Sequence, residues 1–155
     1  MKKKYTYIFI ILISIALLFA SCNLPINKKT KQNNFYYTDE LYKNINSETS
    51  YKCSIVDTNF YKEKNIDSND FSIINNFMKN LDIKYFTSKP KNLPSKPSYK
   101  IFLTFKNETF VINIYDKKYV SVHPWDGYFD MDYIDMSFIP ESYNLYELCN
   151  YVIPR

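Results

Sequence analysis

Few side chains in this sequence could perform covalent chemistry. His123 is the only histidine, and a hydrolase could pair it with Cys53 or a serine as the nucleophile. Cys53, however, falls on the apolar side of an alternating segment, residues 51–55, which does not suit an exposed nucleophile. His123 stands at the end of another such segment, directly before Pro124. We therefore predict that the chain contains no catalytic dyad.

Four aspartates gather near the middle of the second half: Asp126, Asp130, Asp132 and Asp135. Such carboxylates could hold Ca²⁺ or cleave a glycosidic bond as a pair. Asp130 and Asp132 stand two apart on an expected strand, so both side chains should leave the same face. Their spacing does not fit the Asp-x-Asp-x-Asp-Gly calcium loop, and no pattern indicates a cleft. We expect this pair on the solvent face of a half-buried strand, and we predict no metal ion and no cofactor. Whether the four aspartates bind anything stays open.

Trp125, the only tryptophan, lies in a corner of the chain at residues 124–127, near Tyr119 and Tyr128. An exposed tryptophan among tyrosines would suit sugar stacking or a protein-binding hot spot. A tryptophan that fills the end of the core is the interpretation we favour. The high content of tyrosine and phenylalanine does not by itself locate a binding patch.

Two cysteines, Cys53 and Cys149, fall on apolar faces, one of a strand and one of a helix. Outside the cytoplasm they could form a disulfide. Two small buried thiols fit the pattern equally well, so the sequence leaves both alternatives open.

Composition excludes several classes of protein. Gly127 is the only glycine, which excludes glycine-rich phosphate loops and the Gly-x-Ser-x-Gly elbow of hydrolases. The formal net charge is +4, yet six lysines precede residue 35, which leaves −2 for residues 35–155. A nucleic-acid partner needs a clustered basic face, so we predict none.

The first residues have the pattern of a secretory signal. Lys2, Lys3 and Lys4 precede an apolar run at residues 8–20 that only Ser14 interrupts. A helix that spans a bilayer needs about 20 apolar residues, so this shorter run does not predict a permanent membrane helix.

The run ends in the sequence Leu-Phe-Ala-Ser-Cys at residues 18–22, which resembles the lipobox of bacterial lipoproteins. Phe19 departs from the Leu, Val or Ile that is usual in that family. The resemblance implies that residues 1–21 are removed and that Cys22 carries a diacylglyceryl group. Two acyl chains are enough for stable anchoring. We therefore expect the protein at the extracytoplasmic face of the cell membrane, with the membrane as a partner through Cys22.

Polar residues with three lysines follow Cys22, and we interpret residues 22–34 as a flexible tether. Residues 35–155 have the length of one domain. Helical spacing predicts helices at 38–45 and 69–81, and a last helix that Pro140 opens and that buries Leu145, Leu148, Cys149 and Val152. The prolines of residues 88–98 predict a loop.

Alternation predicts a strand at 51–55 and four further strands that begin near Tyr99, Phe110, Val120 and Phe129. The short connections favour an antiparallel meander. The expected fold is therefore α+β: a meander of four or five strands with helices packed on one face. This order of elements behind a lipobox resembles small clostridial-type lipoproteins of unknown function, and the resemblance implies no activity.

The function expected from these features is a non-enzymatic binding or interaction module in the cell envelope. Its partner would be an envelope protein or polysaccharide. The alternative is a small enzyme that acts on cell-wall carbohydrate or peptide, with an acidic site at residues 126–135. A cleft that holds Asp130 and Asp132 beside Trp125 would favour the enzyme.

Overall fold

The computed structural model describes residues 5, 30–48, 50–66 and 68–155. Cys22, most of the expected signal peptide and residues 22–29 of the expected tether lie outside these residues. Within the described ranges, no helix has the length and apolar character needed to cross a membrane.

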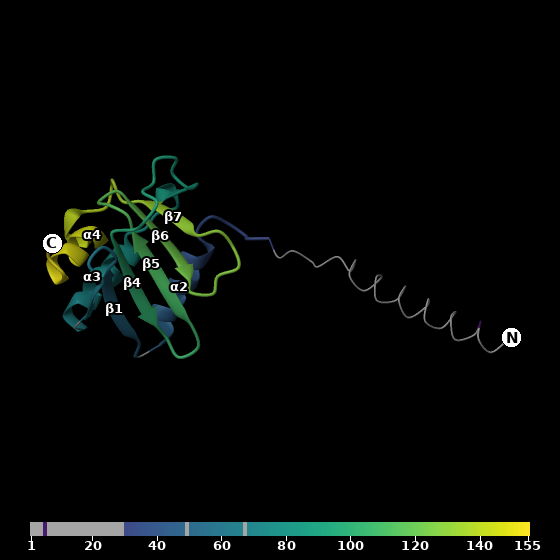
Figure 1. The fold of residues 1–155 in the computed structure, drawn as a ribbon, viewed down its shortest axis with the longest axis horizontal. Coiled ribbons are helices and arrows are strands. Elements are labelled where there is room, and N and C mark those ends of the chain that lie inside the picture. The colour runs from purple at the N-terminus through teal and green to yellow at the C-terminus, as the bar shows by residue number, and fades with distance from the viewer. Residues whose placement is uncertain (1–4, 6–29, 49, 67) are drawn as a thin grey trace. The chain divides into compact units, whose positions relative to one another are not determined.

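Seven antiparallel strands form one open sheet in the described part of the chain (Figure 1). Their spatial order is β2-β1-β4-β5-β6-β7-β3. The strands are β1 (Lys52–Asp57), β2 (Lys62–Asn65), β3 (Phe86–Thr87), β4 (Tyr99–Thr104), β5 (Thr109–Ile114), β6 (Tyr119–Pro124) and β7 (Asp132–Asp135). The four consecutive strands β4 to β7 are neighbours in space, as expected for a meander joined by short turns.

The α+β class is confirmed, but the sheet has seven strands and not four or five. The strand expected at residues 51–55 is β1, and the chain then turns and returns as β2, which pairs with β1. β3 is two residues long and pairs with β7 at the far edge.

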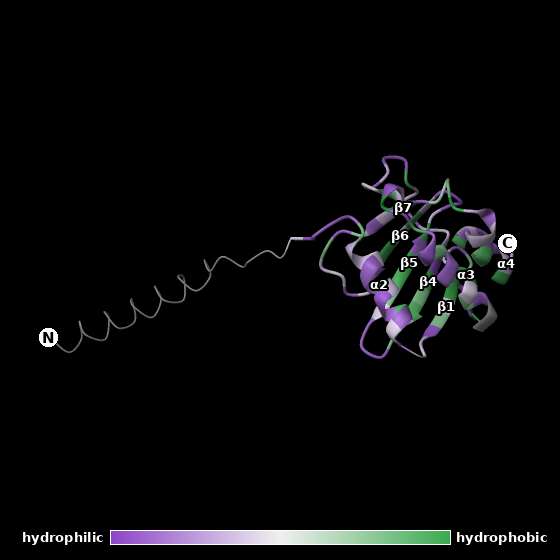
Figure 2. Ribbon diagram, turned by 180° about the vertical axis from the view of Figure 1, so that it is seen from behind, coloured by the Kyte–Doolittle hydropathy of each residue, from purple (hydrophilic) through white to green (hydrophobic). Residues whose placement is uncertain are grey.

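Three α-helices lie in the described part of the chain: α2 (Tyr36–Ser47), α3 (Ser68–Lys79) and α4 (Leu145–Val152). Figure 2, seen from behind, shows α2 and α3 in front of the strands, whereas Figure 1 shows the strands in front. The helices therefore cover one face of the sheet. α4 begins later than expected: the Asn144 side chain accepts a hydrogen bond from the Tyr146 N–H and caps it, while Pro140 precedes a 3₁₀ turn at Glu141–Tyr143.

The core lies between these helices and the inner face of the sheet. Ile101 and Ile112 are paired across β4 and β5 and are fully buried. Leu41 of α2, Ile74 of α3 and Leu148 of α4 pack in the same apolar cluster. Residues 31–155 form one compact unit around this core.

We expect Leu148→Ala to lower the free energy of unfolding by about 2–5 kcal/mol, because it leaves a cavity in the core. Leu148 is 3% exposed. Urea denaturation of residues 31–155 measures the loss. Tyr151→Ala, on the outer side of the same helix and 79% exposed in the native protein, should stay within about 0.5 kcal/mol. Equal effects of the two substitutions would contradict this account of the core.

Candidate functional site

The outer face of the sheet, away from the helices, carries a groove over β1 and β4. Side chains alternate along a strand, so the neighbours of core residues point outward here. Ser54 lies opposite Phe102, and Val56 lies opposite Lys100. All four are half-buried. Two apolar residues, a lysine and a serine therefore form the floor of the groove.

Trp125 forms one wall of the groove, at the turn after β6. Its backbone N–H donates to the carbonyl oxygen of Thr109 at 2.7 Å, which extends the ladder between β5 and β6. The Gly127 N–H donates to the Pro124 carbonyl at 3.0 Å. A Cβ at position 127 would lie 3.1 Å from that oxygen, so glycine permits the close approach.

The Trp125 side chain is 67% exposed, and its ring centroid lies 5.9 Å from that of Phe102. The interpretation that Trp125 fills the end of the core is therefore wrong. Its described ring contact is Phe102 on the outer face, and not the nearby tyrosines of the sequence.

Tyr61 forms the opposite wall, in the turn between β1 and β2. It is 82% exposed, and its φ of 54° lies in the left-handed region that non-glycine residues seldom adopt. The Lys96 ammonium lies 5.2 Å from the centroid of its ring. Two aromatic side chains thus stand on two sides of the groove.

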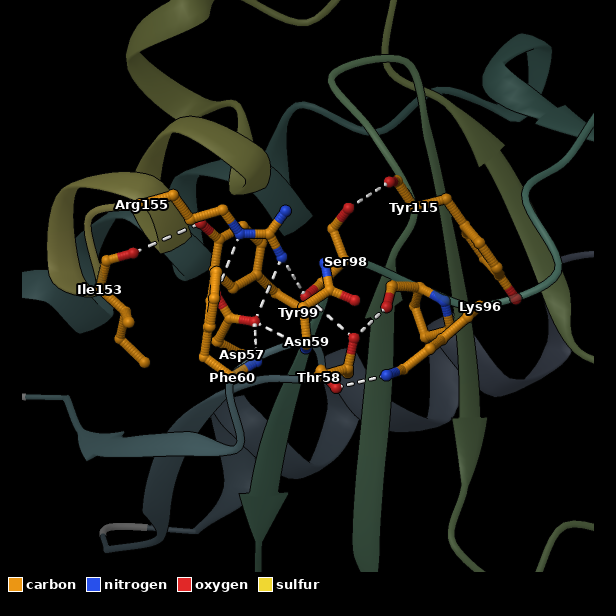
Figure 3. Close-up of polar contacts among 11 residues, drawn as sticks. Asp57, Thr58, Asn59, Phe60, Lys96, Ser98, Tyr99, Tyr115, Ile153 and Arg155 are labelled. Carbon is orange, nitrogen blue, oxygen red and sulfur yellow. Dashed lines mark hydrogen bonds and ion pairs between the residues drawn. The ribbon is translucent and has the colours of Figure 1, made fainter.

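The fully buried carboxylate of Asp57 holds the turn that carries Tyr61 (Figure 3). The Asn59 and Phe60 N–H groups donate to Asp57 Oδ1 at 2.7 and 3.1 Å. Arg155 donates from Nε to Oδ2 at 2.9 Å and from Nη2 to Oδ1 at 3.3 Å. Burial raises the pKa of Asp57, but the hydrogen bonds from Arg155, Phe60 and Asn59 outweigh it and bring the pKa below its ordinary value.

The same cluster fixes the proline-containing loop, residues 88–98, against the turn. The Thr58 N–H donates to the Ser98 carbonyl at 3.1 Å, and Arg155 Nη2 donates to the same oxygen at 2.7 Å. Lys96 Nζ donates to the Thr58 carbonyl. Figure 3 shows these contacts joining the turn, the loop and the end of the chain. One wall of the groove therefore depends on a buried ion pair.

The groove has a volume of about 630 Å³. It is lined by Ser54, Val56, Thr58, Tyr61, Glu63, Ser95, Lys96, Pro97, Lys100, Phe102, Thr104 and Trp125. Among the described residues, the Lys100 ammonium forms no ion pair and the Ser54 and Thr104 hydroxyls form no hydrogen bond. Both positively and negatively charged side chains line it, with Glu63 the only acid.

Asp132 does not lie on the solvent face of β7, so that prediction is wrong. Its side chain is fully buried and points toward the helices. Asp132 Oδ2 accepts from the Thr38 N–H at 2.7 Å and from Thr38 Oγ1 at 2.9 Å, and Lys31 Nζ lies 2.6 Å from Oδ1. Burial raises its pKa, and the bonds from Lys31 and Thr38 offset this only in part.

The four aspartates therefore do not form one acidic site. Asp126 and Asp130 are exposed. Asp135 is half-buried, and its Oδ2 lies 3.7 Å from Lys118 Nζ. The carboxylate of Asp132 is bonded to α2 and Lys31 on the helix-covered face, whereas Trp125 lies on the outer face. The carboxylate pair that a glycosidase would need beside Trp125 is not assembled.

Lys31, within the segment expected to be a tether, lies in the compact unit of residues 31–155. Besides Asp132, its ammonium contacts the Asp130 carbonyl at 2.7 Å, and its side chain is only 18% exposed. A second cavity, of about 670 Å³, lies beside it and is lined in part by Asn33, Thr87 and Phe129. The Lys31 ammonium beside this second cavity is therefore already paired with Asp132. The groove, whose Lys100 has no such partner among the described residues, is the stronger candidate site.

His123 and Cys53 lie on opposite faces of the sheet. His123 is paired with Val111 on the outer face, and Cys53 is paired with Leu103 on the inner face. Cys53 and Cys149 are buried and free, so the alternative of two thiols holds. Burial raises the pKa of Cys53 to about 12 and that of Cys149 well above its ordinary value.

No group of three or more metal-ligating side chains occurs in the part of the chain that the structure describes. The residues that line the groove were not identified from the sequence, apart from Trp125. One signal was present: Val56 and Phe102 are apolar at positions that alternation assigns to the solvent face. Tyr61, Lys96 and Lys100 gave no signal, because contacts between distant segments bring them together.

Two of three comparisons relate the chain to known proteins. Residues 31–149 match the protein family described as Domain of unknown function (DUF4883). The chain is similar to the crystal structure of a "Putative Lipoprotein from Clostridium perfringens", with a TM-score of 0.73 and 32% sequence identity. That match covers 81% of this chain and 100% of the solved chain. The comparison with curated proteins gives no match.

Proposed function

Because the chain belongs to the Domain of unknown function (DUF4883) family, to which no activity is assigned, we propose a function from its geometry. The protein is a lipid-anchored, non-enzymatic binding module of the cell envelope, and the groove between Trp125 and Tyr61 is its binding site. An envelope polymer or protein is the partner.

One observation carries this proposal: two large aromatic side chains are exposed on two sides of one groove. Trp125 is 67% exposed and Tyr61 is 82% exposed. Aromatic side chains of this kind are enriched at binding sites, because they offer a flat apolar surface and a polar group. The left-handed backbone at Tyr61 costs conformational free energy, and the fold keeps it at the residue whose ring is exposed here.

The anchor rests on the lipobox that ends at Cys22 and on the lipoprotein description of the Clostridium perfringens relative. The Cys22→Ala chain should lose lipidation and no longer remain in the membrane fraction. Mass spectrometry of that fraction measures the modification on the native chain. An unmodified Cys22 in the mature wild-type protein would contradict the anchor.

Binding can be tested by fluorescence, because Trp125 is the only tryptophan and its emission reports directly on the groove. Residues 31–155 are suited to this test because they form one compact unit. Their share of the chain is about the same as the 81% that the match to the solved relative covers. Addition of solubilised wall polysaccharide or peptidoglycan fragments should shift the emission to shorter wavelength as the indole leaves water.

Tyr61→Ala should weaken that binding severalfold, because it removes one wall of the groove. Tyr151→Ala is the matched control, since Tyr151 is 79% exposed but lies on α4. Calorimetric titration compares the two variants with the native domain. Binding that is unchanged in Tyr61→Ala, or equally weakened in both variants, would contradict the groove as the binding site.

A further inference from the structure

We propose that the ligand of the groove is an acidic glycan, whose sugar ring stacks on Trp125 and whose anionic group pairs with Lys100. This inference rests on the proposed function, because it names the chemical class that the same groove binds.

Lys100 supplies the argument for a negative charge. It lies on β4, half-buried in the floor of the groove, and within the described residues no carboxylate pairs with its ammonium. Glu63 stands in the same row across the strands, but two strands away, which is about 10 Å at the usual strand spacing. An unpaired ammonium in the floor of a groove is free to form a charge-assisted hydrogen bond with an anionic ligand group.

The surroundings of Lys100 increase the preference for an anion. Lys96 lines the same groove from the loop at residues 88–98, where its ammonium lies over the Tyr61 ring. Two lysines therefore face one glutamate along the groove.

The other lining groups suit a carbohydrate. The exposed Trp125 ring offers a face on which a sugar ring can stack. The Ser54 and Thr104 hydroxyls line the groove and form no hydrogen bond within the described structure, so they are available to sugar hydroxyls. These groups can bind sugar rings and sugar hydroxyls, and none of them depends on main-chain hydrogen bonds from a peptide ligand.

An acidic peptide fits the groove less well. An extended peptide gains most from main-chain hydrogen bonds to a free sheet edge. The groove lies on the face of β1 and β4, whose backbone groups are already paired on both sides: β1 with β2 and β4, and β4 with β1 and β5. A peptide lying there would find no ladder to extend.

The test is a titration of residues 31–155 with tetragalacturonate and with its methyl ester, which has the same rings without the charge. Trp125 emission and calorimetry measure the binding. We expect tetragalacturonate to bind about tenfold more tightly than the ester, the usual difference for one charge-assisted contact. A ribitol phosphate oligomer tests whether phosphate can supply the charge, and hexaglutamate tests the peptide alternative.

Lys100→Met should weaken the binding of tetragalacturonate about tenfold and leave the ester unchanged, because only the acid pairs with Lys100. Lys100→Arg should restore the affinity, which a merely structural role would not explain. Lys79→Met is the matched control: Lys79 is exposed at the end of α3, on the helix-covered side. It should bind both probes as the native domain does.

Four results would overturn the inference. If the acid and its ester bind equally and both shift Trp125 emission, the groove binds glycans without selecting charge. If hexaglutamate binds and no charged glycan does, the ligand is a peptide. If no charged glycan changes the emission while solubilised envelope polymers do, the proposed function stands and the acidic class is wrong. If none of these probes and no envelope polymer gives a response, both proposals fail.

Discussion

Lys31→Met should lower the free energy of unfolding by about 3–5 kcal/mol, the usual cost of leaving one charge of a buried pair alone. Asp132 is fully buried, and Lys31 is the cation that its Oδ1 contacts, at 2.6 Å. Urea denaturation of residues 31–155 measures the loss. A form of the domain that starts at residue 35 should be destabilised in the same way, because it lacks Lys31.

The pH dependence identifies the cause of this loss. The pKa of Asp132 is raised above its ordinary 3.8, chiefly by burial, and the hydrogen bond from Lys31 lowers it. Removal of Lys31 should therefore raise this pKa further. A carboxyl with a raised pKa favours the folded state at low pH, and it loses this contribution as the pH rises through the raised pKa. The difference between native and Lys31→Met domains should thus shrink as the pH falls toward 3.8.

Adding Asp132→Leu to Lys31→Met removes the unpaired charge and should recover part of the lost stability. Lys43→Met is the control for loss of a lysine as such, since Lys43 forms an exposed pair with Asp39. It should change stability by less than about 1 kcal/mol. A difference that does not depend on pH between the native and Lys31→Met domains would show that Asp132 is not the source of the loss.

Asp57→Asn should also cost about 3–5 kcal/mol, because Arg155 would lose its carboxylate partner. Asp57 is fully buried and accepts hydrogen bonds from Arg155 and from two backbone N–H groups of the following turn. An asparagine oxygen could keep the turn contacts, but its amide would face the guanidinium without an acceptor. Asp39→Asn, in an exposed pair, is the matched control and should stay within about 1 kcal/mol.

The contribution of Asp57 to the stability of the native protein changes with pH in the opposite sense from that of Asp132. The pKa of Asp57 is lowered below its ordinary 3.8, because Arg155, Phe60 and Asn59 together outweigh burial. Its contribution to stability is therefore present above pH 3.8 and is lost as the pH falls through the lower, folded-state pKa. The native domain and Asp57→Asn should become more alike in that acidic range. A constant difference across it would contradict the assigned pairing.

Asp57→Asn should further weaken ligand binding, because the turn that Asp57 holds carries Tyr61. Asp39→Asn should not. Binding that is measured where both variants are fully folded separates this positioning effect from the loss of stability.

The sequence allowed the periodic elements to be predicted. Core-facing apolar residues recur at every second position of β4, β5 and β6, and α2, α3 and α4 each have an apolar stripe. Strand β2 could not be predicted because Lys62–Asn65 is polar on both faces. Strand β3 could not be predicted because two residues are too few to show a period.

The orientation of β7 could not be predicted from local pattern, because both of its faces carry apolar residues. Ile134 points to the core and Tyr133 to the other side, and each is buried. In this orientation Asp132 bonds to Thr38, which is 94 residues away in sequence, and such a distant partner leaves no local signal. The groove could not be predicted from local pattern either, because its walls come from turns that are brought near each other only in the folded sheet.

Strand β2 also affects how neighbouring copies of the protein behave. It is the edge of an open sheet, where unpaired backbone groups can recruit a strand from another molecule. Proteins confined to a membrane by lipid, as we propose for this one, meet each other at high two-dimensional density. All four residues of Lys62–Asn65 are exposed and three carry charge, so each copy presents a charged, well-hydrated border. Such a border would let the domains crowd on the cell surface without joining into fibrils.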